Sequence, residues 1–206
     1  MKRIRILIVD DHSVVRMGLA ALLDTIPDFV VAGEAANGSE AIRLAKATHP
    51  DVVLMDLMMP GIGGLTATES LLKLDTPPAV LILTTFSEPS DISRALPLGA
   101  RGALLKSSSN EELATAIHAV AAGKRFVSRE VTRLLREDPA PPQLTHRQLE
   151  ILTYVTRGLT NPDIARLLNI RTDSVGAHLT GIFERLGAAN RSEAVAIALR
   201  KHLLKS

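Results

Sequence analysis

The stretch Asp51-Val-Val-Leu-Met-Asp56-Leu-Met-Met-Pro60 decides the fold. The apolar residues 52–55 lead directly to Asp56, and Pro60 with the glycines after it then interrupts the chain. A short apolar run between such breakers is typical of a buried strand in a parallel sheet. Functional groups in open α/β sheets collect where strands end at the carboxyl edge. A lone aspartate at that place is most simply a turn cap, so the interpretation of Asp56 depends on what the other strand ends carry.

Strand and helix patterns alternate along the first 122 residues. Apolar runs predict strands over 4–9, 29–32, 52–55, 79–83 and 103–105, and helical spacing predicts helices over 13–23, 39–48, 65–73, 91–96 and 110–122. We expect Ser39 and Asn110 to cap the helices that they begin. Because strand and helix alternate five times, the predicted fold class is α/β, a doubly wound five-stranded parallel sheet with helices on both faces.

The rest of the chain predicts a second, smaller domain that is all helical. A short helix over 128–136 is followed by Pro139, Pro141 and Pro142, and proline-rich stretches form semi-extended spacers. Beyond them, helices are predicted over 145–157, 160–168, 172–186 and 191–201, and Thr145 with Gln148 forms a capping box. We therefore divide the chain into a first domain of residues 1–122, a linker of residues 123–143, and a second domain of residues 144–206.

Composition and charge narrow the classes of function. The chain has 206 residues, 46% of them hydrophobic, and it contains no cysteine, which excludes disulfides and thiolate chemistry. Residues 1–122 carry 10 Lys or Arg against 14 Asp or Glu, and residues 143–206 carry 9 against 5. An acidic first domain and a basic second domain suggest two modules with different partners, of which the basic one suits nucleic acid. With neither a signal peptide nor an apolar stretch of membrane-spanning length, we expect a cytoplasmic protein without a membrane partner.

Polar side chains stand at the ends of four of the predicted strands. They are Asp10 and Asp11, Asp56, Thr84 and Lys106. In a parallel sheet these ends lie on one edge, where three carboxylates would repel one another and where Mg²⁺, which prefers oxygen ligands, relieves the repulsion. Asp56 would then be the nucleophile that forms an acyl phosphate, with Lys106 balancing charge and Thr84 hydrogen-bonding a phosphoryl oxygen. Separate strand-end caps explain any one of these residues but explain the whole set poorly.

The same residues carry a family resemblance. The Asp10–Asp11 pair, Asp56 with Pro60 four residues on, Thr84, and Lys106 after two leucines occur in the order typical of a receiver domain. Residues 1–122 thus resemble the receiver domain of two-component response regulators, which has a flavodoxin-like fold. The resemblance implies phosphorylation of Asp56 by a sensor histidine kinase. It also implies Mg²⁺ held by Asp11, Asp56 and the backbone carbonyl of Met58, with Asp10 acting through a water. One departure is Ala103, which stands where the family usually has Tyr or Phe.

A second set of motifs lies in the last third of the chain. Gly158-Leu-Thr-Asn161, Ile164-Ala165, His178-Leu179, Leu186-Gly187 and Asn190-Arg-Ser-Glu-Ala-Val195 occur in one order. Residues 144–204 resemble the LuxR-type helix-turn-helix domain, so the whole chain resembles the NarL/FixJ subfamily. The resemblance implies that the helix over 172–186 enters the major groove of double-stranded DNA and that the helix over 191–201 forms a homodimer contact. The residues expected at DNA are Thr160, Asn161, Arg171, Ser174, Gly176, Ala177, Thr180 and Arg185, and those expected at the dimer contact are Arg191, Val195 and Leu199.

The predicted recognition helix is poor in cations. Only Arg171 and Arg185 offer positive charge to phosphates, and Gly176 stands where the family usually has Lys. Our hypothesis is a transcription regulator, not an enzyme, that is phosphorylated on Asp56 and then dimerises on an inverted repeat in a promoter. The alternatives are a regulator of this architecture that acts through protein contacts, with weak or lost DNA binding, and a Mg²⁺-dependent phosphohydrolase that uses Asp56.

Overall fold

The computed structural model describes residues 3–85, 89–137, 144–200 and 203. The chain divides into two compact units, Met1–Ala140 and Pro141–Ser206. The three prolines of the predicted spacer lie outside the described residues. Each unit is described by itself.

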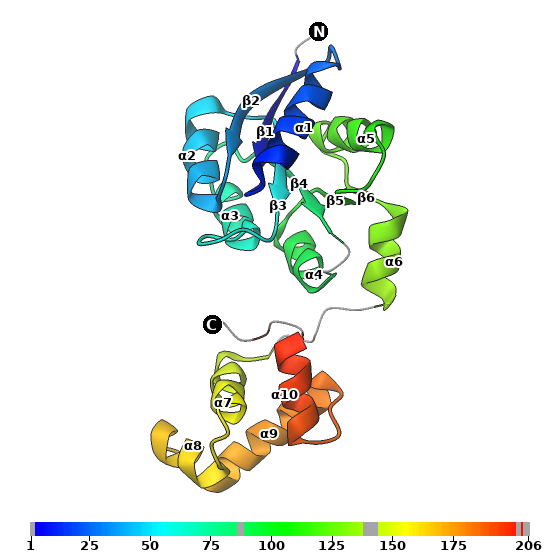
Figure 1. Cartoon of the computed structure of the whole chain (residues 1–206). Coiled ribbons are helices and arrows are strands. Elements are labelled where there is room, and N and C mark those ends of the chain that lie inside the picture. The colour runs from blue at the N-terminus through cyan, green and yellow to red at the C-terminus, as the bar shows by residue number, and fades with distance from the viewer. Residues whose placement is uncertain (1–2, 86–88, 138–143, 201–202, 204–206) are drawn as a thin grey trace. The chain divides into compact units, whose positions relative to one another are not determined.

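The first unit contains a parallel sheet with the strand order β2-β1-β3-β4-β5-β6 (Figure 1). Its strands are β1 (Ile4–Val9), β2 (Phe29–Ala35), β3 (Val52–Asp56), β4 (Ala79–Thr84), β5 (Gly102–Leu105) and β6 (Phe126–Val127). The predicted parallel α/β sheet is confirmed, but the predicted number of five strands is wrong. The two residues of β6 pair with Gly102 and Ala103 at the free edge of β5, and a strand this short has no alternation to reveal it.

Helices cover both faces of this sheet. They are α1 (Ser13–Asp24), α2 (Gly38–Thr48), α3 (Gly64–Leu71), α4 (Pro89–Leu98), α5 (Asn110–Ala121) and α6 (Arg129–Glu137). Two buried clusters show how the layers form: α2, α3, α4 and α6 pack on one face, and α1 and α5 on the other (Figure 1). This is the doubly wound arrangement that the alternating sequence predicts.

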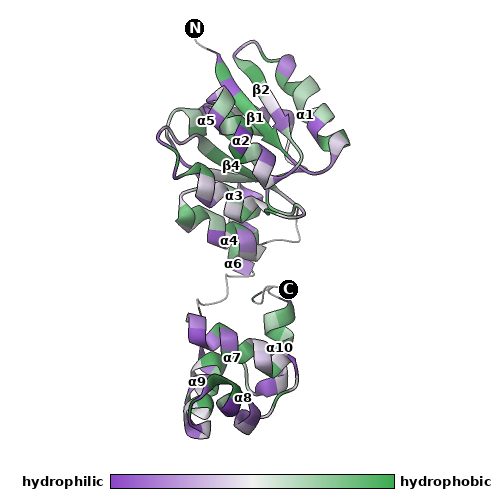
Figure 2. Ribbon diagram, turned by 90° about the vertical axis from the view of Figure 1, so that its left-hand side faces the viewer, coloured by the Kyte–Doolittle hydropathy of each residue, from purple (hydrophilic) through white to green (hydrophobic). Residues whose placement is uncertain are grey.

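The core reflects the period of two along each strand. In β1, Leu7 and Val9 belong to the cluster under α2 and α3, whereas Ile6 and Ile8 belong to the cluster under α1 and α5. All four side chains are buried, because a parallel sheet has helices on both faces. Figure 2 accordingly shows β1 and β4 as largely hydrophobic.

Two predicted helix caps are wrong by one or two residues. Asn37, rather than Ser39, caps α2 by accepting a hydrogen bond from the Glu40 N–H. Ser109, rather than Asn110, caps α5 by accepting one from the Glu112 N–H. In both places two cap-forming residues stand close together, and the one with extended backbone supplies the cap.

The short helix after β6 packs against the sheet of the first unit. The Ser128 N–H donates to the Ala103 carbonyl at 3.1 Å, and Val131 of α6 is fully buried in the same cluster as α4 side chains. The residues from β6 to the end of α6, expected to lie in the linker, are therefore packed on the first unit.

The second unit is all helical, as predicted, and consists of α7 (His146–Thr156), α8 (Asn161–Leu168), α9 (Thr172–Leu186) and α10 (Arg191–Arg200). The capping box of Thr145 and Gln148 is present at the start of α7. Asn169 ends α8 in the left-handed conformation and begins the turn to α9. A buried aliphatic cluster from all four helices forms the core of this unit. No helix in the described residues is long and apolar enough to cross a membrane.

Candidate functional site

The strand register brings the predicted site residues to one edge of the sheet. Val9 pairs with Met55, so Asp10 follows β1 beside the end of β3, where Asp56 lies. Asp56 pairs with Leu83, and Thr84 pairs with Leu105. The Lys106 N–H donates to the Thr84 carbonyl at 2.7 Å, which places Lys106 directly after β5 at the same edge.

Lys106 joins two of the carboxylates. Its Nζ lies 2.7 Å from Asp10 Oδ2 and donates to Asp56 Oδ2 at 2.7 Å. Asp10 is 2% exposed and Asp56 is 3% exposed, so both are carboxylates from which water is largely excluded. A buried charge is costly unless it is paired, and one ammonium group here faces two carboxylates.

The third carboxylate leaves acceptor capacity unused. One ligand atom each from Asp10, Asp11, His12 and Asp56 lies within 4.8 Å of the others. Asp11 Oδ1 is buried and 2.8 Å from His12 Nδ1, yet no donor in the described part of the chain is oriented to hydrogen-bond it. Clustered carboxylate oxygens with an unsatisfied acceptor suit a hard divalent cation, so the residues present fit Mg²⁺.

Burial shifts the pKa of two groups in the cluster. Burial raises the pKa of the Asp56 carboxyl above its ordinary value; Lys106 opposes the shift, and Asp10 adds to it. Burial lowers the pKa of Lys106, but its hydrogen bonds to Asp10 and Asp56 outweigh this, and the net pKa is raised. Lys106 thus stays protonated at neutral pH and serves as the fixed cation of the site.

The loop after β3 positions Asp56 by close backbone contacts. The Met58 N–H donates to Asp56 Oδ1 at 3.3 Å, so the backbone of Met58 lies beside the carboxylate. The Gly64 N–H donates to the Leu57 carbonyl at 3.0 Å, and a Cβ on Gly64 would lie 2.0 Å from the Asp56 carbonyl oxygen. Only glycine permits this approach. Thr84 is fully buried, and its hydroxyl donates to the Thr85 carbonyl at 3.2 Å.

The contacts of two residues at this edge, His12 and Arg16, were not predicted from the sequence. His12, the residue after the aspartate pair, donates its N–H to Asp10 Oδ1 at 2.9 Å. Arg16 donates from Nη1 to the Asp10 carbonyl at 2.7 Å, and its Nε lies 3.6 Å from Glu34 on β2. The position of His12 directly after the aspartate pair could have predicted its contact with Asp10. Glu34 is distant from Arg16 in the sequence, and no local pattern indicates that the two residues meet.

Ala103 is fully buried and belongs to the cluster that contains Val131 of α6. The α6 helix contacts both β5 and α4. At the position of the usual aromatic residue, this chain therefore has a small core side chain beneath a helix.

The predicted DNA-contacting residues on α9 form an exposed strip with few cations. Ala177, Thr180 and Arg185 are exposed, and Ser174 and Gly176 are half-buried. Figure 2 shows α9 with mixed hydropathy. A Cβ on Gly176 would meet nothing within 4 Å, so the position is open. Arg171, just before α9, is 85% exposed, and its Nη2 lies 3.5 Å from Asp173, which partly offsets its charge.

Three further predicted residues form contacts inside the domain. The Thr160 hydroxyl accepts a hydrogen bond from the Asp163 N–H in a capping box. Arg191 donates to Asn161 Oδ1 at 3.1 Å and also to the Leu159 carbonyl. Arg191, expected at a dimer contact, thus connects the start of α10 to the start of α8, through a pairing across 30 residues that no local pattern reveals.

The other two residues expected at a dimer contact differ in exposure. Val195 is half-buried and packs against the core of the second unit. Leu199 on the same helix is 60% exposed. Of the three residues, Leu199 presents the most apolar surface to a partner.

Comparisons with known proteins agree with this geometry. Residues 6–118 match the model of the response regulator receiver domain. Residues 142–198 match the model of the bacterial regulatory proteins of the luxR family. The first match contains the acid cluster, which consists of Asp10, Asp11, Asp56, Thr84 and Lys106. The second match contains α7, α8 and α9.

Relatives match over almost the full length. The chain is 39% identical to the transcriptional regulatory protein LiaR of Bacillus subtilis, covering 98% of this chain and 99% of the relative. It is 35% identical to the response regulator protein VraR of Staphylococcus aureus, covering 98% and 99%.

Solved structures agree as well. The response regulator ChrA of a heme-sensing two-component system is 36% identical with a TM-score of 0.61, covering 99% of this chain and 100% of that one. RcsB of Salmonella enterica serovar Typhimurium bound to a promoter is 25% identical with a TM-score of 0.71, covering 98% and 100%. The chain therefore belongs to the response regulators that combine a receiver domain with a LuxR-type DNA-binding domain, a family of transcription regulators.

Proposed function

We propose that a sensor histidine kinase phosphorylates this regulator on Asp56, and that the phosphoryl group controls dimerisation and binding to an inverted repeat in promoter DNA. The observation that carries the proposal is the buried Asp56 carboxylate, hydrogen-bonded to Lys106 and beside Asp10 and Asp11 at one sheet edge. Phosphoryl chemistry is assigned to residues 1–122, the connection to residues 123–143, and DNA binding to residues 144–206.

Each residue of the cluster has a role that follows from its position. A carboxylate oxygen of Asp56 attacks the phosphorus; the new O–P bond forms as the N–P bond to the kinase histidine breaks. Lys106, already 2.7 Å from Asp56, turns its ammonium group to the phosphoryl oxygens. Thr84 at the end of β4 donates its hydroxyl to the same oxygens. Asp11, Asp56 and the Met58 carbonyl would hold Mg²⁺, with Asp10 acting through a water, and the ion would supply positive charge that offsets the phosphoryl charge.

The signal then passes through α4 and α6. Thr84 ends β4, α4 follows it, and α4 packs against α6, which also contacts β5. Because Ala103 has no ring to rotate, we assign the relay to a shift of α4 against Val131 of α6. The chain leads from α6 directly into the segment that precedes the DNA-binding domain.

We assign DNA binding to α9, and two protomers bind the DNA together. Few cations per protomer mean few phosphate contacts, so one domain binds weakly and a dimer on two half-sites binds better. Leu199, 60% exposed on α10, is the apolar residue assigned to the dimer contact.

A second candidate is a regulator that acts mainly through protein contacts. The observations in its favour are the open Gly176 position, the Arg171 side chain near Asp173, and the use of Asn161 within the domain. In that case α9 meets a protein surface and the affinity for DNA is low.

The test combines phosphorylation with DNA binding. The full chain is incubated with acetyl phosphate and Mg²⁺ and analysed by intact mass, beside Asp56→Asn and the control Asp75→Asn. We expect one added phosphoryl group on the wild type and on the control, and none on Asp56→Asn. Fluorescence anisotropy with DNA from the promoter of its own operon should then show tighter binding after phosphorylation. Wild-type labelling of Asp56→Asn would overturn the assignment of the phosphoacceptor, and unchanged anisotropy would favour the protein-contact candidate.

A further inference from the structure

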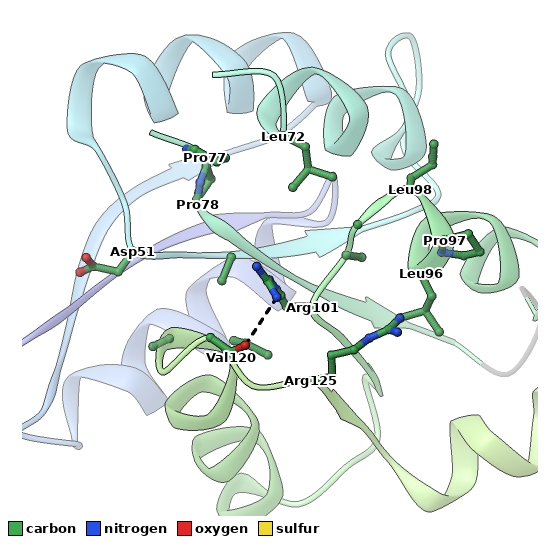
Figure 3. Close-up of a pocket in the computed structure, with 15 residues that line it drawn as sticks. Asp51, Leu72, Pro77, Pro78, Leu96, Pro97, Leu98, Arg101, Val120 and Arg125 are labelled. Carbon is green, nitrogen blue, oxygen red and sulfur yellow. Dashed lines mark hydrogen bonds between the residues drawn. The ribbon is translucent and has the colours of Figure 1, made fainter. Parts of the chain in front are cut away.

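A hollow of about 810 Å³ lies at the opposite edge of the sheet from the acid cluster, where β4 and β5 begin (Figure 3). Much of its wall is apolar. Its apolar residues include Leu72, Pro78, Leu96, Pro97, Leu98 and Val120. The size is that of a site for a small organic molecule, for which about 300–1,000 Å³ is usual. Leu98 is 44% exposed, so part of this wall meets water.

Arg101 lines this hollow, is exposed to water and has a fixed backbone. Its N–H donates to the Val80 carbonyl at 2.8 Å, and its carbonyl accepts from the Phe126 N–H at 3.0 Å. The guanidinium reaches the Gly123 carbonyl only at 3.5 Å, a long hydrogen bond. Figure 3 shows Arg101 between Leu72 and Pro78 on one side and Val120 on the other. Most of its five donors remain available to a ligand.

Arg125 adds a second cation from the segment before β6. It lines the same hollow, and Figure 3 shows its side chain extending toward Leu96. Within the described ranges, neither Arg101 nor Arg125 forms an ion pair with a carboxylate. Two guanidinium groups beside an apolar wall thus have no carboxylate partner among the residues that the structure describes.

Asp51 is the acidic residue that lines the hollow, and it faces elsewhere. Its Oδ2 accepts a hydrogen bond from the Arg5 N–H at 2.8 Å. Figure 3 shows its carboxylate pointing away from Arg101. The end of the hollow that holds the two arginines is therefore positively charged.

We propose that this hollow binds a small organic anion with an apolar body, such as a medium-chain carboxylate. A planar guanidinium matches a carboxylate in a bidentate fashion, which fits the head group. The leucine and proline side chains cover the body, which gains by leaving water. The wall of prolines and leucines fits a small amphiphile better than a nucleic acid, whose binding needs many cations along a backbone. The site is separate from Asp56 and does not rest on its phosphorylation.

The test uses the full chain and a matched pair of probes. Isothermal titration calorimetry is run with sodium octanoate and with 1-octanol, which has the same apolar body without the charge. We expect octanoate to bind with one-to-one stoichiometry and to bind more tightly than 1-octanol. Arg101→Gln and Arg125→Gln should each weaken octanoate binding about tenfold, because each removes a charge-assisted hydrogen bond. Arg43→Gln, which removes an exposed arginine on α2, is the control and should bind as the wild type does.

Three outcomes would overturn the proposal. They are the absence of octanoate binding to the wild type, equal binding by Arg101→Gln, Arg125→Gln and the control, and equal affinity for octanoate and 1-octanol.

A fall in molar mass for the two arginine variants in light scattering, without any octanoate binding, would show instead that the hollow contacts a second copy of the chain. Circular dichroism confirms that each variant is folded, and acetyl phosphate labelling confirms it for the arginine variants. Asp56→Asn should bind octanoate normally, which separates this proposal from the phosphorylation proposal.

Discussion

Lys106→Met removes the cation of the acid cluster while keeping a long apolar side chain. In the wild type, Nζ lies 2.7 Å from Asp10 Oδ2 and 2.7 Å from Asp56 Oδ2. The substitution leaves two carboxylates that are 2% and 3% exposed facing one another. Each carboxylate keeps one hydrogen bond from a backbone N–H: the His12 N–H donates to Asp10, and the Met58 N–H donates to Asp56.

The magnitude follows from these contacts. Breaking a buried pair costs about 3–5 kcal/mol of unfolding free energy. Lys106 is 20% exposed and the carboxylates keep their backbone donors, so we expect the lower part of that range, about 3 kcal/mol. Mg²⁺ should offset more of the loss in the variant than it adds to the wild type, because the competing ammonium group is gone. At a concentration ten times its dissociation constant, a ligand adds about 1.4 kcal/mol.

The chain offers an internal control for the measurement. Its one tyrosine, Tyr154, lies in the second unit, and the chain has no tryptophan, so tyrosine fluorescence reports that unit alone. Urea unfolding is followed by circular dichroism, which reports both units, and by Tyr154 fluorescence, which reports the helical unit alone, with and without Mg²⁺. Lys106→Met should shift the part of the circular dichroism transition that Tyr154 fluorescence does not follow, and should leave the fluorescence transition unchanged. A loss below about 0.5 kcal/mol, or equal stabilisation of variant and wild type by Mg²⁺, would refute the argument.

Asp56→Asn should raise the melting temperature at neutral pH. Burial raises the pKa of the Asp56 carboxyl in the folded state above its ordinary value of 3.8. Ionisation of this carboxyl therefore lowers the stability of the wild type as the pH rises from 3.8 through the folded-state pKa. In differential scanning fluorimetry the advantage of the variant should be absent near about pH 4 and grow toward about pH 7, and a constant difference would contradict it. Val131→Ala should lower the unfolding free energy of the sheet unit by about 2 kcal/mol, whereas the exposed Arg129→Ala should not; equal effects would show that α6 is not packed as described. Gly176→Lys should tighten DNA binding and steepen its salt dependence by about 0.9 per added phosphate contact, and Arg185→Ala should weaken binding; if a salt titration by anisotropy shows neither change, α9 does not face DNA.

The site was predictable from the sequence because strand period and parallel pairing place strand ends together. Four of the five predicted apolar runs end at a chemically active residue, and a parallel sheet brings such ends to one edge whatever the details of packing. That is why the sequence alone predicts that Asp10, Asp56, Thr84 and Lys106 lie together.

Contacts between residues distant in sequence were not predictable in this way. Arg191 was assigned to a dimer surface, yet it donates to Asn161 and to the Leu159 carbonyl in its own domain. The cap of α2 illustrates the local limit: Asn37 and Ser39 are both good caps, and only the backbone conformation decides between them. Strand β6 was not predicted for a third reason. It has only two residues, which are too few to show an alternation of side chains.

The packing around Ala103 gives a physical meaning to its departure from the family pattern. In sequence it is only the absence of a ring near the phosphoacceptor. In the structure it is fully buried, pairs with Ile82 and Val127, and accepts a hydrogen bond through its carbonyl from the Ser128 N–H. A ring introduced at residue 103 would therefore have to displace the β6–α6 segment or part of the core beneath it. Because α6 contacts both α4 and β5, any movement of α4 would act on α6 directly. The small residue and the packed helix belong together: the first makes room for the second, and the second leads the chain toward the DNA-binding domain.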